Sequence, residues 1–318
     1  MIQSAKKTVP SAKRKAGVFA RLGHNIRKHP LPYLMALVVL TYFALFCYWP
    51  MYGNIVAFKK YKPFLGMAGS KWIGFDNFTS FFTSYYFVRI MRNTLILSLL
   101  NLVIGFPVPI LFAILLNEVR SLRYKKLIQT ATYLPHFIST VIICSMVTQF
   151  TNSSGFITAF VNWAAGHSGS LIGDANSYRA IYVASDIWAG FGWGSILYIA
   201  AMTGIDPTLY EAATIDGAGR GKQIWHITLP GIKETIVIMF ILACGRVMSV
   251  GWEKSFLLQS PLTYETSDII STFVYRKGFE DNDYGYSAAV NMFNSVINLI
   301  LLVTANRISR KLSDSSLW

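Results

Sequence analysis

The sequence has 318 residues, of which 53% are hydrophobic and 14% are charged, and this apolar excess lies outside the range of ordinary soluble domains. Its formal net charge of +14 would suit a nucleic-acid-binding protein, so the placement of the basic residues matters more than their number.

Six apolar runs account for the hydrophobic excess. They cover approximately residues 32–58, 87–116, 127–150, 178–202, 232–250 and 288–304, and about 20 apolar residues suffice to cross a bilayer as a helix. The sequence therefore predicts an all-α polytopic membrane protein. A basic cytoplasmic tail is expected over residues 1–30, and a six-span transmembrane domain over residues 31–318.

Basic residues are concentrated on one side of the predicted spans. If the N-terminus lies in the cytoplasm, the inner segments hold 18 of the 29 Lys and Arg residues, while the outer segments hold eight. By the positive-inside rule, this asymmetry places both termini in the cytoplasm, as an even number of spans requires. The basic excess is then explained by topology, and no nucleic-acid partner is expected.

The two longer outer segments differ in composition. Residues 59–86 are rich in aromatic side chains, which are expected either to lie along the outer membrane surface or to pack over the helix bundle. Residues 251–287 are expected to form a solvated loop or to contact a soluble extracellular partner, because they carry six acidic side chains: Glu253, Glu265, Asp268, Glu280, Asp281 and Asp283.

Proline and glycine interrupt several spans. Pro107 and Pro109 follow Gly105 in the second span and predict a bend or local unwinding, because each proline removes a backbone donor. Pro135 predicts a similar break in the third span. Such breaks fit a protein with a translocation path, but simple packing kinks explain them equally well. In the fourth span, small residues are expected to let neighbouring helices approach closely: Gly190, Gly192 and Gly194.

A short polar stretch between the fourth and fifth spans, residues 203–231, is predicted to form a docking loop on the cytoplasmic side. Asp206 and Pro207 predict a helix start, since Asp can accept from free backbone N–H groups and Pro tolerates the first turn. A helix is expected over residues 209–216, ended by Gly217 in a left-handed conformation. Small side chains in and after this helix would let another protein approach the backbone: Ala212, Ala213 and Ala218. Glu211 and Asp216 add negative charge beside them.

The glycines that follow do not form a phosphate-binding loop. Residues 217–222 look similar to one, but Asp216 stands where a P-loop needs glycine, and Gln223 stands where it needs Ser or Thr. The five His and three Cys residues also lack the spacing of a metal or catalytic site. The chain is therefore expected to be no enzyme and to bind neither a nucleotide nor a metal itself.

The pattern Glu-Ala-Ala, three residues, Gly, nine residues, Ile, one residue, Leu-Pro is matched in full by residues 211–230. This stretch resembles the signature loop of bacterial ABC importer permeases. Residues 52–59, 74–78 and 133–137 are similar, more narrowly, to the LplB-type oligosaccharide and polysaccharide permeases of the carbohydrate group. Together with the six spans, the resemblance covers nearly the whole chain.

The resemblance implies a type I importer fold embedded in the lipid bilayer of the bacterial cell membrane. It also implies a second, homologous permease, two cytoplasmic ABC ATPases that bind ATP and Mg, and an extracellular solute-binding protein that delivers a carbohydrate. In such permeases the matching loop is the coupling helix that docks in a groove of the ATPase. That role falls here on Glu211, Ala212, Ala213, Asp216, Gly217 and Ala218.

Sugars favour aromatic faces and hydrogen-bonding side chains, which makes a set of residues in the spans candidates for substrate contact: Trp188, Trp193, Tyr198, Arg246, Asn291, Asn294 and Asn298. Arg246 is the most unusual, because an intramembrane charge should face a cavity or a partner. It is expected to contact an acidic sugar or to form an ion pair. For the tryptophans, ordinary packing is the alternative.

A secondary transporter or a channel would also explain the spans and the broken helices. Such a protein would have no need of a docking loop, and it should show inverted repeats, which are not found in this sequence. An importer permease driven by a partner ATPase is therefore the function that the sequence favours.

Overall fold

The computed structural model describes residues 27–166 and 168–312 of the chain. The chain divides into two units, Met1–Ile55 and Val56–Trp318. Most of the basic tail that the sequence predicts over residues 1–30 lies outside the described residues.

The described part of the first unit is one continuous helical stretch. It comprises α2 (Pro30–Tyr42), η1 (Phe43–Tyr48), α3 (Trp49–Met51) and the start of η2 (Tyr52–Phe58). Pro30 opens the first turn, where its missing N–H leaves no helix hydrogen bond unmade. The whole stretch is long and apolar enough to cross a bilayer, as predicted for the first span.

The second unit comprises a two-stranded hairpin and a series of helices. In chain order these are β1 (Lys59–Lys60), η3 (Pro63–Leu65), α4 (Gly66–Gly69), β2 (Lys71–Trp72), α5 (Asp76–Phe82), α6 (Phe87–Leu100), η4 (Asn101–Gly105), α7 (Pro107–Asn117), α8 (Leu122–Tyr133), η5 (Leu134–Phe137), α9 (Thr140–Thr151), α10 (Phe156–Ala165), α11 (Ala175–Gly194), α12 (Ile196–Thr203), α13 (Pro207–Ile215), α14 (Arg220–Gln223), η6 (Ile224–Thr228), α15 (Leu229–Gly231), α16 (Lys233–Cys244), α17 (Trp252–Leu258), η7 (Pro261–Thr263), α18 (Tyr264–Ser267), α19 (Ile270–Tyr275), η8 (Arg276–Glu280) and α20 (Tyr284–Leu312).

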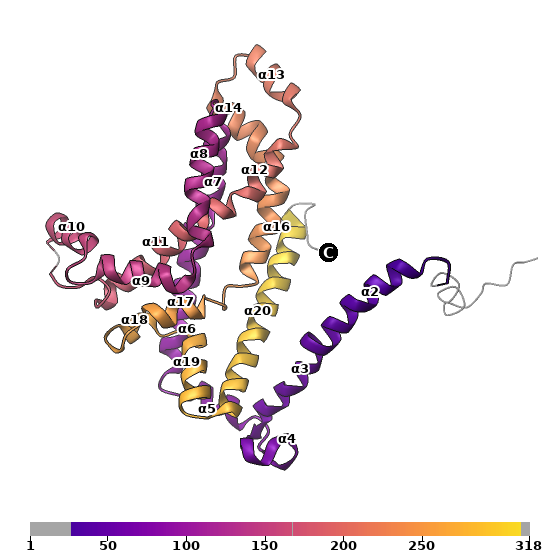
Figure 1. Ribbon diagram of the computed structural model, residues 1–318, viewed down its shortest axis with the longest axis vertical. Coiled ribbons are helices and arrows are strands. Elements are labelled where there is room, and N and C mark those ends of the chain that lie inside the picture. Colours follow the sequence, from indigo (N-terminus) through magenta and orange to yellow (C-terminus); the bar gives the residue numbers. More distant parts are fainter. Residues whose placement is uncertain (1–26, 167, 313–318) are drawn as a thin grey trace, which may run out of the picture. The chain divides into compact units, whose positions relative to one another are not determined.

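Two long helices match the second and sixth predicted spans. α6, η4 and α7 form one helix of 31 residues, and α20 is nearly as long. Within the second unit, α13 lies at one end, and α5 and α19 lie at the opposite end (Figure 1). The long helices therefore separate the docking loop from the segments that the sequence assigns to the outer side.

The third predicted span is not straight. α8 and α9 form a pair that is bent by 99° at residues 138–139. Pro135 lies just before this corner and has no N–H to donate, and the Ser139 hydroxyl starts the new helix by accepting from the Ile142 backbone N–H at 3.4 Å. The expectation of a single span over 127–150 is thus corrected to two helices around a corner.

The number of spans also differs from the expected six. Within the described ranges, three helices are long and apolar enough to cross a bilayer, and two bent pairs would raise the number to five. The second bent pair joins the short helices α14 to α15 with α16 at 62°, and α16 ends at Cys244 instead of residue 250. α11 and α12 are helical over the fourth predicted span but are not among these candidate spans.

Three π-helical turns each end two residues before a proline: η1 before Pro50, η4 before Pro107 and η6 before Pro230. Proline has no N–H, and its ring clashes with the carbonyl four residues earlier in an α-helix. A π-turn relieves both problems, because its carbonyls accept from the residue five positions later. The bend predicted around Pro107 is thus a local widening of a continuous helix.

Glycine allows one close helix contact in the fourth predicted span. A Cβ atom on Gly192 would lie 2.2 Å from the backbone oxygen of Thr132 in α8, whereas one on Gly194 would lie 3.2 Å from the Pro109 ring. A Cβ on Gly190 would meet nothing within 4 Å. The predicted close approach is therefore confirmed at Gly192, where α11 meets α8.

The aromatic outer segment packs partly on the helix bundle. Phe81 of α5 is fully buried, with ring contacts to Phe293 and Tyr286 of α20. Tyr85, in contrast, is 90% exposed. Packing over the bundle is thus the correct alternative for α5, which closes one end of the core.

Candidate transport cavity and docking loop

A cavity of about 540 Å³ lies among α6, η4, α9, α11 and the turn that follows α16. Its walls carry hydroxyl, amide and charged groups beside aromatic and aliphatic ones. The polar and charged lining residues are Ser98, Asn101, Thr140, Tyr182, Asp186, Arg246, Ser249, Glu253 and Lys254. Such a mixture suits a hydroxyl-rich ligand better than an apolar one.

Arg246 enters the cavity from a turn that is closed by its own hydrogen bond and held in place by two helices. The turn is closed by a hydrogen bond from the Ser249 backbone N–H to the Arg246 carbonyl at 2.8 Å. Asn298 of α20 accepts from the Met248 N–H at 2.9 Å, and Ser98 of α6 donates to the Val247 carbonyl. Among the described residues, no carboxylate forms an ion pair with Arg246, so its charge is available to a ligand.

A second basic residue of the cavity is already paired. Lys254 Nζ lies 3.1 Å from Asp186 Oδ1 and donates to the Tyr182 carbonyl at 2.9 Å. The ammonium group also lies 4.5 Å from the centre of the Tyr182 ring. Burial lowers the pKa of Lys254, and the neighbouring Asp186 carboxylate opposes that shift. Lys254 is thus paired with a carboxylate, whereas Arg246 forms no ion pair among the described residues, although Glu253 lies in the same wall.

The other candidate substrate residues have different environments. Asn298 holds the Arg246 turn, Asn294 is buried with its side-chain oxygen unpartnered, and Asn291 is exposed. Trp188 lines a separate apolar pocket of about 630 Å³ between α9, α10 and α11. Of the seven positions predicted to contact substrate, Arg246 lines the 540 Å³ cavity and Asn298 supports its turn.

The remaining two aromatic candidates pack against protein. Trp193 stacks on His136, with ring centroids 4.6 Å apart, and Tyr198 is buried in an apolar cluster with Ile110 and Met202. Neither residue lines the 540 Å³ cavity. For Trp193, the packing alternative is the one that the structure supports.

Asp186 and Lys254 are cavity residues that the sequence interpretation missed. Asp186 stands inside an apolar run, where a charged residue indicates a functional site or an ion pair. That signal was present in the sequence. Lys254 gave no comparable signal, because it falls in a segment expected to be a solvated loop.

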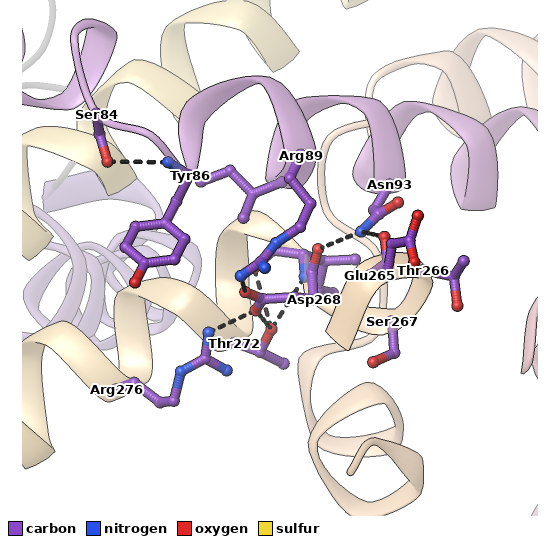
Figure 2. Close-up of polar contacts among 12 residues, drawn as sticks. Ser84, Tyr86, Arg89, Asn93, Glu265, Thr266, Ser267, Asp268, Thr272 and Arg276 are labelled. Carbon is purple, nitrogen blue, oxygen red and sulfur yellow. Dashed lines mark hydrogen bonds and ion pairs between the residues drawn. The ribbon is translucent and has the colours of Figure 1, made fainter. Parts of the chain in front are cut away.

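The segment 251–287 is folded and largely internal, so the expectation of a solvated loop is wrong for its middle part. Asp268 is fully buried and accepts from Arg89 of α6 at 3.0 Å and from Arg276 at 2.7 Å (Figure 2). Asn93 of α6 donates to the carbonyls of Asp268 and Glu265 in the same view. Several polar contacts thus attach this segment to α6, beside the helix α17 that carries Lys254.

The docking loop starts and ends as its sequence predicts. The Asp206 carboxylate accepts from the Thr208 N–H at 2.9 Å, and hydrogen bonds from the Thr208 backbone and hydroxyl lower the pKa of Asp206. Gly217 has a φ of 74°, a left-handed conformation that glycine adopts without strain. The helix itself, α13, begins at Pro207 and ends at Ile215.

The outer surface of α13 is open. The side chains of Glu211, Ala212 and Asp216 are exposed, and Ile215 is 87% exposed. Tyr210, Glu211, Thr214 and Ile215 line a shallow depression on this helix. An apolar side chain beside acidic and small ones is an arrangement that a partner protein can cover.

Among known proteins, the chain is similar to permeases of polysaccharide transport systems. It is 43% identical over 287 residues to the polygalacturonan/rhamnogalacturonan transport system permease protein YteP of Bacillus subtilis (strain 168), covering 90% of this chain and 89% of that protein. It is 42% identical over 287 residues to protein LplB of the same organism, covering 90% of each chain.

Its fold is also similar to that of a solved transporter. One chain of a bacterial alginate ABC transporter, in complex with an alginate pentasaccharide-bound periplasmic protein, superposes with a TM-score of 0.85. The two chains are 40% identical, and the match covers 93% of this chain and 100% of that one. The similarity confirms the predicted type I ABC permease fold and the LplB-type resemblance.

Residues 92–314, which include the cavity lining and the docking loop, match a single family model. The chain belongs to the family of binding-protein-dependent transport system inner membrane components.

Proposed function

We propose that the chain is the permease subunit of an ATP-driven importer that takes up a carboxylate-bearing oligosaccharide or polysaccharide fragment. The observation that carries the proposal is Arg246, a cation without an ion-pair partner among the described residues, whose turn is held at the wall of a polar cavity by α6 and α20. Guanidinium binds carboxylate with charge-assisted hydrogen bonds. The polygalacturonan and alginate named for its relatives are both polymers of uronic acids, which supports an acidic sugar.

A membrane topology of six spans, with both termini in the cytoplasm, belongs to this proposal. Three long helices would supply three spans, each of the two bent pairs would supply one broken span, and α11 with α12 would supply the sixth. The charges of Arg179 and Asp186 then have polar partners within the protein: Arg179 donates to Asn93 at 3.0 Å, and Asp186 pairs with Lys254 at the cavity wall. The inner concentration of basic residues supports the same orientation.

The proposed transporter contains four further proteins: a second, homologous permease, two cytoplasmic ATPases that bind ATP and Mg, and an extracellular solute-binding protein. The exposed helix α13 would dock on an ATPase through Glu211, Ala212, Ala213, Asp216, Gly217 and Ala218. ATP binding would move the ATPase groove, and the permease would alternate between states open to either side of the membrane. Only a contact that differs between those states can drive such a change.

The substrate assignment is tested with Arg246→Gln in transporter reconstituted with its binding protein and ATPases. We expect KM for a uronate oligosaccharide to rise about tenfold, because the substitution removes one charge-assisted hydrogen bond. Uptake of a neutral oligosaccharide should change little. Arg123→Gln on α8, at an exposed residue outside the cavity lining, is the matched control. Equal effects of the two substitutions would overturn the assignment.

The docking assignment is tested with Glu211→Lys and Gly217→Val. Both should abolish uptake while the protein remains in the membrane, because one reverses a charge on α13 and the other places a β-branched side chain at a left-handed position. Gly219→Val is the matched control, since Gly219 has an ordinary backbone conformation and open space around it. Normal uptake by both variants, or ion-driven uptake by this chain alone, would overturn the proposal.

A further inference from the structure

We infer that Gln223 and the pair Tyr210–Thr228 are positioning residues that fix the docking helix α13 to the helix leading into the cavity. The inference rests on the proposed docking role of α13. It concerns how a displacement of α13 reaches the transport cavity, and it involves three side chains outside the docking residues themselves.

The first brace lies at the C-terminal end of α13. The Gln223 side-chain amide donates to the Thr214 hydroxyl at 3.0 Å and to the Ala218 carbonyl at 3.2 Å. These acceptors stand on opposite sides of the Gly217 turn. One amide on α14 therefore adds a side-chain contact to a turn that is also closed by two backbone hydrogen bonds, from the Gly217 N–H to the Thr214 carbonyl and from the Ala218 N–H to the Ala213 carbonyl.

The second brace lies nearer the N-terminal end of α13. The hydroxyl groups of Tyr210 and Thr228 share a hydrogen bond of 3.0 Å, and Thr228 is buried in η6. With Gln223, this contact attaches α13 at two separated points to the continuous α14–η6 segment. Two attachment points prevent a short helix from pivoting, whereas one would allow it.

The chain beyond these braces is also fixed. Ile232, between α15 and α16, is fully buried in a cluster with Ile110 and Met202. A Cβ on Gly231 would lie 2.6 Å from the Ile205 side chain, so the backbone is tightly enclosed there. A displacement of α13 is thereby passed to α16 without an intervening loose loop.

The far end of α16 carries the turn with Arg246. That turn begins directly after Cys244 and is attached to α20 through Asn298. The structure thus forms a contiguous connection from the proposed ATPase contact to the unpaired cation of the cavity. Loss of either brace should let α13 move without moving Arg246.

The test uses substitutions that remove single polar groups and leave the shape nearly unchanged. These are Gln223→Leu, Tyr210→Phe and Thr228→Val, each in the complete transporter reconstituted in proteoliposomes. The readout is the amount of sugar imported per ATP hydrolysed. We expect this ratio to fall by about two- to tenfold in each variant, which corresponds to one lost hydrogen bond. ATPase binding should be retained.

Two comparisons separate positioning from general destabilisation. Tyr124→Phe, on an exposed residue of α8, should leave the ratio unchanged. The double variant Tyr210→Phe with Thr228→Val should be no worse than either single change, because both remove the same hydrogen bond. An unchanged ratio in all brace variants, or additive effects in the double variant, would overturn the inference.

The outcome also distinguishes the inference from the docking proposal. If Glu211→Lys and Gly217→Val abolish uptake while the brace variants keep the wild-type ratio, only the bracing role is wrong. If all five variants import normally, the docking role fails, and the bracing role fails with it.

Discussion

Asp268 accepts a hydrogen bond of 3.0 Å from Arg89, a residue that lies 179 positions earlier in the chain. The Asp268 carboxylate is fully buried, and Arg276 approaches its other oxygen. Asp268→Asn would leave both guanidinium groups without their counter-charge. We expect a loss of about 3 kcal/mol of stability. This value is at the lower end of the cost of breaking a buried ion pair, because both arginines are partly exposed. The melting temperature of the purified complex measures it.

Asp281→Asn is the matched control for that measurement. Asp281 pairs with Lys277 four residues earlier in the sequence, and its side chain is 53% exposed. Solvent screens such a pair, so this substitution should change the melting temperature very little. Equal shifts for Asp268→Asn and Asp281→Asn would contradict the structural role of the buried carboxylate.

Gly192→Ala should destabilise the permease strongly, because the new Cβ would overlap the Thr132 backbone oxygen at 2.2 Å. Forced separation of α11 from α8 costs about 1–3 kcal/mol or more. Gly190→Ala, two residues away on the same helix, meets no atom and should be neutral or slightly stabilising. Protein level in the membrane and thermal stability distinguish the two variants, and similar values for both would refute this account of the helix contact.

Much of the docking loop was predictable because its signals are local. Asp206 caps the helix by accepting from the N–H of Thr208, two residues later, and Gly217 ends the helix through its own backbone conformation. Prolines likewise indicated where a helix departs from regular α-helical geometry. The sequence could not tell a widened helix at Pro107 from a 99° corner after Pro135, because neighbouring helices decide between them.

The interior polar contacts were not predictable in the same way. Asp268 stands in an acidic segment that reads as a loop, and its partner Arg89 comes from a helix far away in the sequence. Three asparagines of α20 looked equivalent as substrate contacts. They lie on one face of the helix, because seven residues make about two turns, and they differ in their position along it, so that Asn298 reaches the Met248 N–H while Asn291 is exposed.

Asn298→Ala is predicted to weaken substrate binding without a direct substrate contact. The change removes a 2.9 Å hydrogen bond to Met248 and a 2.8 Å one to Ser249, so the turn that carries Arg246 loses these two hydrogen bonds to α20. One net hydrogen bond is worth about 1 kcal/mol, which corresponds to about a fivefold rise in KM for a uronate oligosaccharide. Asn291→Ala should leave KM unchanged, and a shift of the same size there would contradict the distinction between the two residues.

The buried Lys254 should make stability depend on alkaline pH. Burial lowers its pKa in the folded protein from the ordinary value of 10.5, so between the lowered pKa and 10.5 the unfolded chain binds more protons. The unfolding free energy therefore rises with pH across that interval, and Lys254→Met should abolish this contribution. Lys277 is the opposite case, because its hydrogen bond to Asp281 raises its pKa; since solvent screens this exposed pair, only a small stability is lost as pH rises above 10.5. The measurement is the melting temperature of wild type minus that of each Met variant across the alkaline range. This difference should rise with pH for Lys254→Met and fall with pH for Lys277→Met. Parallel curves would contradict both assignments.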